Sequence, residues 1–262
     1  MEKNQFTFMQ MNTPSHLLYA YDELALTIKK KARMPDVDDI FSVSYDKHEL
    51  NGAFIGLNLA LMNMNAAILE GSLRSLLCEM IQRNSESLGE HSRANATKSE
   101  YLVLTRSYDL LKRFQEEVEF QGGWEKLKRQ YKEYLGINLD GILDKEKTSG
   151  INSIFILRNV AAHGTSYIIP KDTLTDDDKG TYPFKWQSKT QSLTVYTQKI
   201  FRSDVLTAFT HPCFAYHYMD LIKELIECIF REDLPPNAKL LLDNIRSYSF
   251  GYRNFGPVVL EK

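Results

Sequence analysis

The sequence predicts a mainly α-helical single domain that carries one small β-hairpin. Apolar residues recur at spacings of three and four in several long segments, as they do on helices with one buried face. One stretch, between residues 182 and 197, alternates apolar and polar side chains instead, which is typical of paired strands. We find no internal repeat and no low-complexity segment that would indicate a repetitive architecture.

Four helices are expected in the first half of the chain. They are residues 17–33, 54–83, 101–118 and 124–135. Pro35 accounts for the end of the first, because proline excludes the preceding residue from helical geometry. The pair Gly122 and Gly123 separates the third from the fourth, since glycine favours chain reversals over helix interiors.

Three further helices are expected in the second half, at residues 149–163, 214–230 and 237–245. Thr148 or Ser149 is the expected N-cap of the first of these, and Gly164 is its expected left-handed C-cap. The alternating segment between the first and second is predicted to form two strands, residues 182–186 and 192–197. A polar turn at residues 188–191 would join them.

Composition predicts a cytoplasmic protein that does not enter a membrane. The three cysteines, Cys78, Cys213 and Cys228, are odd in number and far apart, which favours a reducing compartment over a disulfide framework. The N-terminus lacks a signal-peptide pattern, and no apolar run is expected to be long enough to span a bilayer. The net charge of −2 provides no overall basic field for nucleic acid, so any RNA site needs a local basic patch.

Side chains suited to catalysis gather at the end of the predicted helix 149–163. Arg158, Asn159 and His163 lie within six residues, and Asn159 and His163 share a helical face because they are four apart. Arginine holds a phosphate with a planar fork of donors, and histidine transfers protons near neutral pH. These groups together are sufficient to cleave RNA without a metal ion.

The pattern Arg-Asn-x-x-x-His followed by glycine resembles the signature of the HEPN superfamily (higher eukaryotes and prokaryotes nucleotide-binding domains). Arg158 and His163 match the two signature positions, and Asn159 matches the polar residue that often follows the arginine. The resemblance implies an antiparallel helical bundle formed by residues 51–164 and 203–246. An N-terminal extension, residues 1–50, and an inserted loop and β-hairpin, residues 165–202, depart from the usual pattern within the same single domain, 1–262.

Many proteins with this signature are metal-independent endoribonucleases of toxin–antitoxin or anti-phage systems. The resemblance therefore implies an enzyme that needs no cofactor, acts on single-stranded or tRNA-like RNA, and has a possible antitoxin or defence partner. The 2′-hydroxyl would attack the adjacent phosphate, with His163 as general acid or base and Arg158 stabilising the charge. Because one histidine cannot easily serve as acid and base together, a homodimer with paired sites is expected.

Two candidate supporting residues of the site lie on the long predicted helix. Glu70 and Arg74 are four residues apart, which is the spacing of an ordinary intrahelical ion pair of small energy. Alternatively, Glu70 reaches the signature helix and orients Arg158 or His163, as an acidic or polar residue on an earlier helix does in some HEPN proteins.

Other interpretations stay open at this stage. Arg158 could pair with a structural carboxylate while His163 caps the helix, or the whole chain could be a non-catalytic HEPN-like module that binds RNA, a nucleotide or a protein. A metal site at His211, Cys213 and His217 is not expected, because no fourth ligand is evident. Basic residues gather at 29–33 and at 126–132, and a ribonuclease would use one of these clusters to guide RNA.

Overall fold

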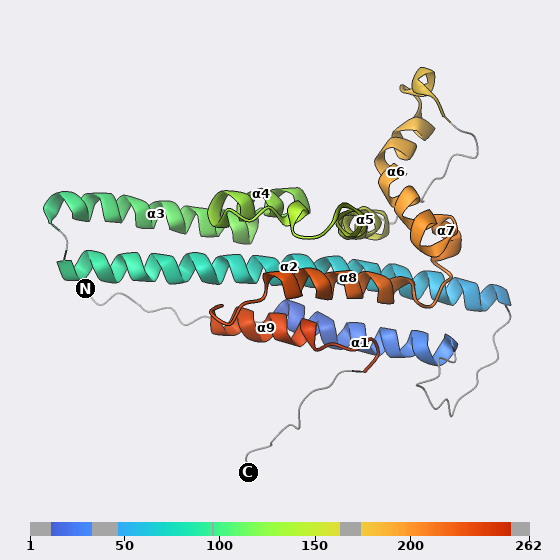
Figure 1. The fold of residues 1–262 in the computed structure, drawn as a ribbon, viewed down its shortest axis with the longest axis horizontal. Helices are drawn as coiled ribbons and strands as arrows, with labels where there is room; N and C mark the ends of the chain where they lie inside the picture. The colour runs from blue at the N-terminus through green and yellow to red at the C-terminus, as the bar shows by residue number, and fades with distance from the viewer. Residues whose placement is uncertain (1–11, 33–46, 96, 163–173, 253–262) are drawn as a thin grey trace, which may run out of the picture.

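The protein was analysed as a computed structural model that describes residues 12–32, 47–95, 97–162 and 174–252. Over these ranges it is mainly helical, as the sequence predicts. The helices are α1 (Thr13–Ala32), α2 (Lys47–Asn95), α3 (Lys98–Phe120), α4 (Trp124–Leu135), α5 (Lys145–Ala162), α6 (Tyr182–Phe201), α7 (Val205–Ala208), α8 (Phe214–Ile229) and α9 (Pro236–Arg246), as Figure 1 shows. Short 3-10 turns occur at Leu139–Gly141 and Asp176–Asp178.

The predicted β-hairpin is wrong, because residues 182–201 form helix α6. Thr181 caps this helix by accepting a hydrogen bond from the backbone N–H of Phe184, and Pro183 sits in the first turn, where its missing N–H costs nothing. The residues that α6 buries are Thr190, Leu193, Tyr196 and Thr197. Their spacing of three, three and one follows a helical face, so the apparent alternation in this segment was coincidental.

Helix α2, which we call the spine, is the central helix of the molecule. It contacts α1, α3, α4, α5, α8 and α9. It is 49 residues long. In Figure 1 it runs along most of the molecule, with α3, α4 and α5 on one side, α1 and α9 on the other, and α8 across its front. The sequence predicted only its middle, residues 54–83, because its ends carry a weaker apolar stripe. A helix with neighbours on both sides needs apolar residues around much of its circumference.

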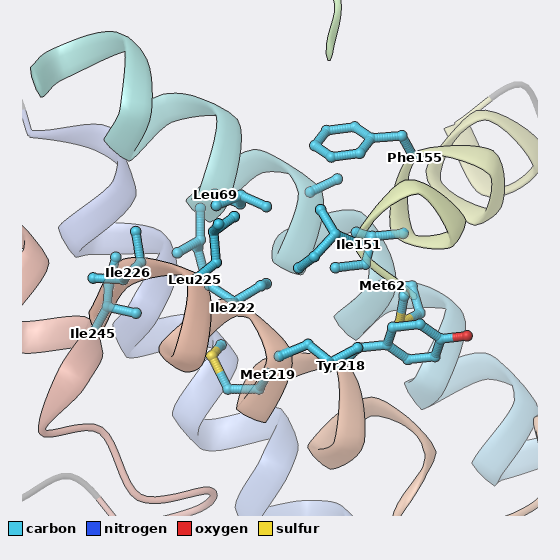
Figure 2. Close-up of a cluster of buried hydrophobic side chains, with 14 of the residues drawn as sticks. Met62, Leu69, Ile151, Phe155, Tyr218, Met219, Ile222, Leu225, Ile226 and Ile245 are labelled. Carbon is cyan, nitrogen blue, oxygen red and sulfur yellow. The ribbon is translucent and has the colours of Figure 1, made fainter. Parts of the chain in front are cut away.

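The hydrophobic core lies where α8 meets α2, α5 and α9. Figure 2 shows side chains from these four helices meeting in one cluster: Met62 and Leu69 of α2, Ile151 and Phe155 of α5, Tyr218, Met219, Ile222, Leu225 and Ile226 of α8, and Ile245 of α9. The α8 residues recur at spacings of three and four, so one face of that helix is buried along its whole length. This face was correctly predicted, and it fixes α5 against the spine.

Polar side chains of α2 hold the connections between other helices. Asn58 is buried, and its Nδ2 donates to the carbonyl oxygens of Phe209 and His211 at 2.7 and 3.1 Å. Its Oδ1 accepts from the N–H of Ala215 at 3.3 Å, so the α7–α8 connection is fixed to α2. Further along, Glu79 accepts from the N–H of Ala238 in the first turn of α9 at 3.0 Å, where a negative charge is favoured.

Helix α2 is also long and apolar enough to meet a length-and-composition test for a membrane span. The tested segment covers Asn51–Glu90, its best window has a mean hydropathy of 1.5, and 44% of that window is buried. The sequence expectation that no apolar run reaches this length is therefore wrong. The central helix of a soluble bundle passes the same test, and α2 has helices packed on it from both sides.

Candidate active site

Helix α5 carries the signature residues Arg158 and Asn159 and begins four residues earlier than predicted. Asp144 caps it by accepting a hydrogen bond from the N–H of Lys147 at 2.9 Å, so neither Thr148 nor Ser149 is the N-cap. The side chain of Ser153 bonds back to the carbonyl of Ser149 within the same helix. The described part of α5 ends at Ala162, and the predicted C-cap Gly164 lies outside the described residues.

Aromatic packing fixes α5 against α4. The ring of Phe155 stacks on Trp124 of α4 with centroids 4.3 Å apart and planes 9° from parallel. The indole Nε1–H of Trp124 donates to Oδ1 of Asn152 at 2.8 Å. Because a large stacked pair and a hydrogen bond join α4 to α5, the last turns of α5 have a defined rotation around the helix axis.

Arg158 is held by Glu70 of the spine. Its Nη2 donates to Oε2 of Glu70 at 3.1 Å, across 88 positions of sequence. The side chain of Arg158 is 33% exposed, whereas that of Glu70 is 15% exposed. A guanidinium has five N–H donors. Among the described residues, Glu70 is the hydrogen-bond partner of the Arg158 guanidinium. The sequence hypothesis that Glu70 reaches the signature helix thus corresponds to a contact in the structure.

Glu70 is shared with Arg74, so the intrahelical pair is present as well. Oε1 of Glu70 accepts from Nη2 of Arg74 at 2.8 Å, from its Nε at 3.3 Å, and from the backbone N–H of Gly123 at 3.1 Å. Nη1 of Arg74 donates to the carbonyl oxygens of Val118 and Gln121 at 2.5 and 3.1 Å. Arg74 therefore binds the exposed carbonyl end of α3, where a cation is favoured.

The three charged groups leave one positive charge in excess at this end of α5. Two guanidiniums flank one carboxylate, and Arg74 is committed to Glu70 and to the carbonyls of α3. Arg158 has a single described partner and is the more exposed of the two arginines. An anion that approaches this end of α5 would therefore meet Arg158 as its available donor.

Of the other two signature residues, the structure describes Asn159 but not His163. Asn159 is exposed, and no side-chain hydrogen bond joins it to Arg158, Glu70 or Arg74 among the described residues. Successive helical residues point about 100° apart, so Asn159 faces away from the contact between Arg158 and Glu70. His163 follows the last described residue of α5 and lies outside the described residues.

Most of the basic cluster at residues 126–132 is neutralised by neighbouring acids. Lys126 pairs with Glu117 at 2.6 Å, and Arg129 approaches Glu133 at 3.8 Å. Lys128 pairs with Glu125 and with Asp140, each at 2.9 Å. Burial acts to lower the pKa of Lys128, but its hydrogen bonds to these carboxylates outweigh burial and raise the pKa.

In the other basic cluster, Lys29 is buried and lies over the ring of Tyr252 at 4.1 Å from its centroid. Arg33 lies outside the described residues. Lys128 and Lys29 are therefore engaged within the molecule, which weakens the expectation that these clusters guide RNA.

The segment around His211 and His217 has internal hydrogen bonds instead of a ligand cluster. Nδ1 of His211 accepts from the N–H of Cys213 at 3.1 Å, and Nε2 of His217 lies 2.6 Å from the hydroxyl of Tyr196. Burial lowers the pKa of His217, with a smaller opposing effect from Asp220. Among the described residues, no group of three His, Cys, Asp or Glu side chains is arranged to hold a metal ion.

Sequence reasoning missed the contact between Tyr196 and His217 because it placed Tyr196 on a strand. Thr181 and Pro183 are a signal for a helix start, and on such a helix Tyr196 shares a face with Leu193.

Comparison with known proteins finds no matching family model, no matching curated protein and no matching solved structure.

Proposed function

We propose that the protein is a metal-independent endoribonuclease of the HEPN type, with Arg158, Asn159 and His163 as its catalytic residues. The observation that carries this proposal is the anchoring of Arg158 by Glu70 at the end of α5, with a third of the arginine side chain still exposed. His163 is the fifth residue after Arg158, so the phosphate-binding and proton-transferring groups belong to one short segment.

The electrostatic arrangement suits a phosphate in the transition state. Arg74 offsets the charge of Glu70, so Glu70 can orient Arg158 without cancelling its charge. Preorganised donors of this kind stabilise developing negative charge because they need no rearrangement during the reaction. Asn159, being exposed, would contact the RNA directly and not through Arg158.

The proposed reaction is an internal transfer at phosphorus. The 2′-hydroxyl oxygen of one nucleotide attacks the adjacent phosphorus atom and gives its proton to a general base. The bond from phosphorus to the 5′-oxygen breaks, and that oxygen receives a proton from a general acid. The products are a 2′,3′-cyclic phosphate and a 5′-hydroxyl. His163 supplies one of the two proton transfers.

The second proton transfer requires a second group, and we propose that a homodimer provides it through His163 of the other copy. We propose further that the enzyme acts in the cytoplasm on single-stranded or tRNA-like RNA, as a toxin or anti-phage effector that an antitoxin or defence partner controls. This biological setting follows from the HEPN resemblance alone.

The test is cleavage of labelled RNA in the presence of a metal chelator. Wild type should produce ends with a cyclic phosphate, and His163→Ala should lose about 10²- to 10⁴-fold in rate while its circular-dichroism spectrum stays helical. Arg158→Ala should also lose most activity, and Arg158→Lys should recover only part of it, because a point charge cannot reproduce the planar fork. Asn159→Ala should do less harm.

Arg113→Ala is the matched control for Arg158→Ala, because Arg113 is an exposed arginine on α3, away from α5. It should cleave at the wild-type rate. Cleavage by His163→Ala at the wild-type rate would assign the activity to a contaminant or to another site. If wild type binds RNA but leaves it intact, the chain is a non-catalytic binding module and the enzyme proposal is wrong.

A further inference from the structure

Helix α6 differs from the rest of the chain in its charge. Its 20 residues include Lys185, Lys189 and Lys199 but no aspartate or glutamate, although the whole protein has a net charge of −2. The first half of α6 is mostly exposed, and Figure 1 shows this end of the helix rising away from the spine. The helix itself therefore carries only positive side-chain charges, while the acidic turn Asp176–Asp178 lies just before its first residue.

Aromatic and basic side chains alternate along one face of this projecting half. Tyr182, Lys185, Trp186 and Lys189 have the spacing i, i+3, i+4 and i+7, which places them on one side of a helix. Tyr182 is 62% exposed, both lysines are exposed, and Trp186 is partly buried. Nζ of Lys189 lies 5.9 Å from the ring centroid of Trp186. We call these four residues the α6 face.

The lysines of the α6 face form no ion pair within the described part of the chain. Neighbouring cations are paired: Lys199 bonds to Glu146 of α5, and Lys179 lies 3.1 Å from Asp176. Neither Lys185 nor Lys189 has a carboxylate partner among the described residues. This distinguishes the α6 face from the cluster on α4, where Lys126, Lys128 and Arg129 all have acidic partners.

The C-terminal half of α6 is fixed to α5, the helix that carries Arg158. A Cβ atom added at Gly150 of α5 would lie 2.5 Å from the hydroxyl of Tyr196, so glycine is what allows the two helices to approach this closely. The ion pair between Lys199 and Glu146 joins the same helices. Packing at the C-terminal half of α6 therefore sets the orientation of α6 relative to α5, independently of the exposed N-terminal half.

We propose that the α6 face binds single-stranded RNA, with Lys185 and Lys189 on phosphates and Tyr182 stacked against a base. This deepens the proposed function, on which it rests, by placing part of the substrate on α6 beside the helix of Arg158. An aromatic ring is favourable for a nucleic acid only where bases are unpaired and free to stack, which selects single strands over duplexes. Exposed lysines spaced along one face add a sequence-independent attraction to phosphates.

The first experiment measures binding separately from cleavage. The probe is a fluorescent 2′-O-methyl oligouridylate, which lacks the attacking hydroxyl and therefore stays intact even with an active enzyme. Lys185→Ala/Lys189→Ala should flatten the slope of log affinity against log salt by about 1.4, since each phosphate contact on a single strand contributes about 0.7. The same relation gives an affinity loss of about 25-fold at 0.1 M salt.

A matched control removes the same charge elsewhere. Lys112 and Arg113 are exposed on α3 and have no acidic partner among the described residues. The Lys112→Ala/Arg113→Ala protein should bind the probe with wild-type affinity and salt dependence. An equal loss of affinity in both double variants would show that only net charge matters, and it would overturn the proposal for the α6 face.

The second experiment tests stacking. Tyr182→Ala should weaken binding of the oligouridylate by about 5- to 150-fold, the range that loss of one stacked base produces. It should leave unchanged the affinity for an abasic oligonucleotide of equal length, and Tyr182→Phe should restore binding because the ring remains. If Tyr182→Ala weakens both probes equally, or neither, the tyrosine does not stack on a base.

The outcomes separate this proposal from the enzyme proposal. Loss of binding in the α6 variants, with a wild type that cuts no RNA, would support the α6 face and refute the nuclease. Wild-type affinity in the α6 variants, with RNA still cut through Arg158 and His163, would refute the α6 face alone. If phosphatidylserine vesicles displace the oligonucleotide and their binding depends equally on Tyr182, the face serves a membrane and the RNA proposal is wrong.

Discussion

At the scale of single residues, Glu70 has the most consequential set of contacts in the candidate site. Its carboxylate receives hydrogen bonds from Arg158, Arg74 and Gly123, which belong to three different segments of the chain. Hydrogen bonds to charged groups are stronger than neutral ones, and a charged group that loses its partner inside a protein is costly. One side chain therefore couples the position of Arg158 to the corner between α3 and α4.

We predict that Glu70→Gln lowers both stability and activity. The amide keeps one acceptor for Gly123 but leaves two guanidiniums without a carboxylate, at a cost of about 1–2 kcal/mol for this partly exposed group. The cleavage rate should fall, because Arg158 loses the group that positions it. Thermal unfolding and single-turnover cleavage measure the two effects. Glu116→Gln, at an exposed position on α3, is the control.

A double-mutant cycle separates positioning from a general loss of stability. If Glu70 acts through Arg158, Glu70→Gln should have no further effect on the cleavage rate in an Arg158→Ala background. Independent, additive losses of rate would contradict the positioning role. The contact itself joins positions 88 apart. Sequence spacing identified Glu70 only through its intrahelical partner Arg74, and the resemblance supplied the hypothesis that it reaches α5.

His217 should make the stability of the protein depend on pH. Burial lowers its pKa in the folded state below the unfolded value of about 6.5. Between those two pKa values the unfolded chain binds more protons than the folded one. The contribution of His217 to the free energy of unfolding is therefore fully present above about pH 6.5 and is lost as the pH drops toward the lowered value. His217→Gln, which stays neutral, should flatten this part of the profile in denaturant titrations.

At the scale of elements, helix prediction succeeded where one strong apolar stripe faced the interior, as in α4 and α8. The alternating pattern failed in α6, because Leu193 and Thr197 are buried on the helical face while Val195, between them, is 61% exposed. Thr181 as N-cap and Pro183 in the first turn are a signal for a helix that the sequence analysis did not use. Packing against α5 then decides the outcome, since Leu193 and Tyr196 are buried on the helical face.

The close approach of α5 and α6 depends on Gly150. A methyl group there would lie 2.5 Å from the hydroxyl of Tyr196 and 2.6 Å from Cδ1 of Leu221, so one of the helices must shift. We predict that Gly150→Ala destabilises the protein by about 1–3 kcal/mol through overpacking. Gly56→Ala, on α2 with nothing within 4 Å of its added methyl group, should be neutral or stabilise by up to about 1 kcal/mol. Urea unfolding compares them, and similar midpoints would contradict tight packing at Gly150.

At the scale of the whole molecule, the arrangement follows from one long helix. Different faces of α2 hold the α7–α8 connection through Asn58, the start of α9 through Glu79, and Arg158 of α5 through Glu70. The sequence indicates a bundle through its apolar stripes, but these three contacts are side-chain bonds between distant segments, which local periodicity does not encode. The contact of Glu70 fixes Arg158 of α5 within a single chain, and the proposed chemistry then requires a second copy.

The last prediction concerns that second copy. If each active cleft needs His163 from both chains, mixing wild type with His163→Ala protein should create heterodimers that lack one proton-transferring group. After exchange, activity should follow the square of the wild-type fraction, so an equal mixture retains roughly a quarter of the activity of the same total amount of wild type. A chain that works alone would retain roughly half, because its activity is proportional to the number of wild-type copies. Light scattering on the same samples measures the oligomeric state. A monomer at micromolar concentration with full activity and a linear mixing curve would show that the composite site is wrong, while leaving Arg158 and His163 of one chain as the reacting pair.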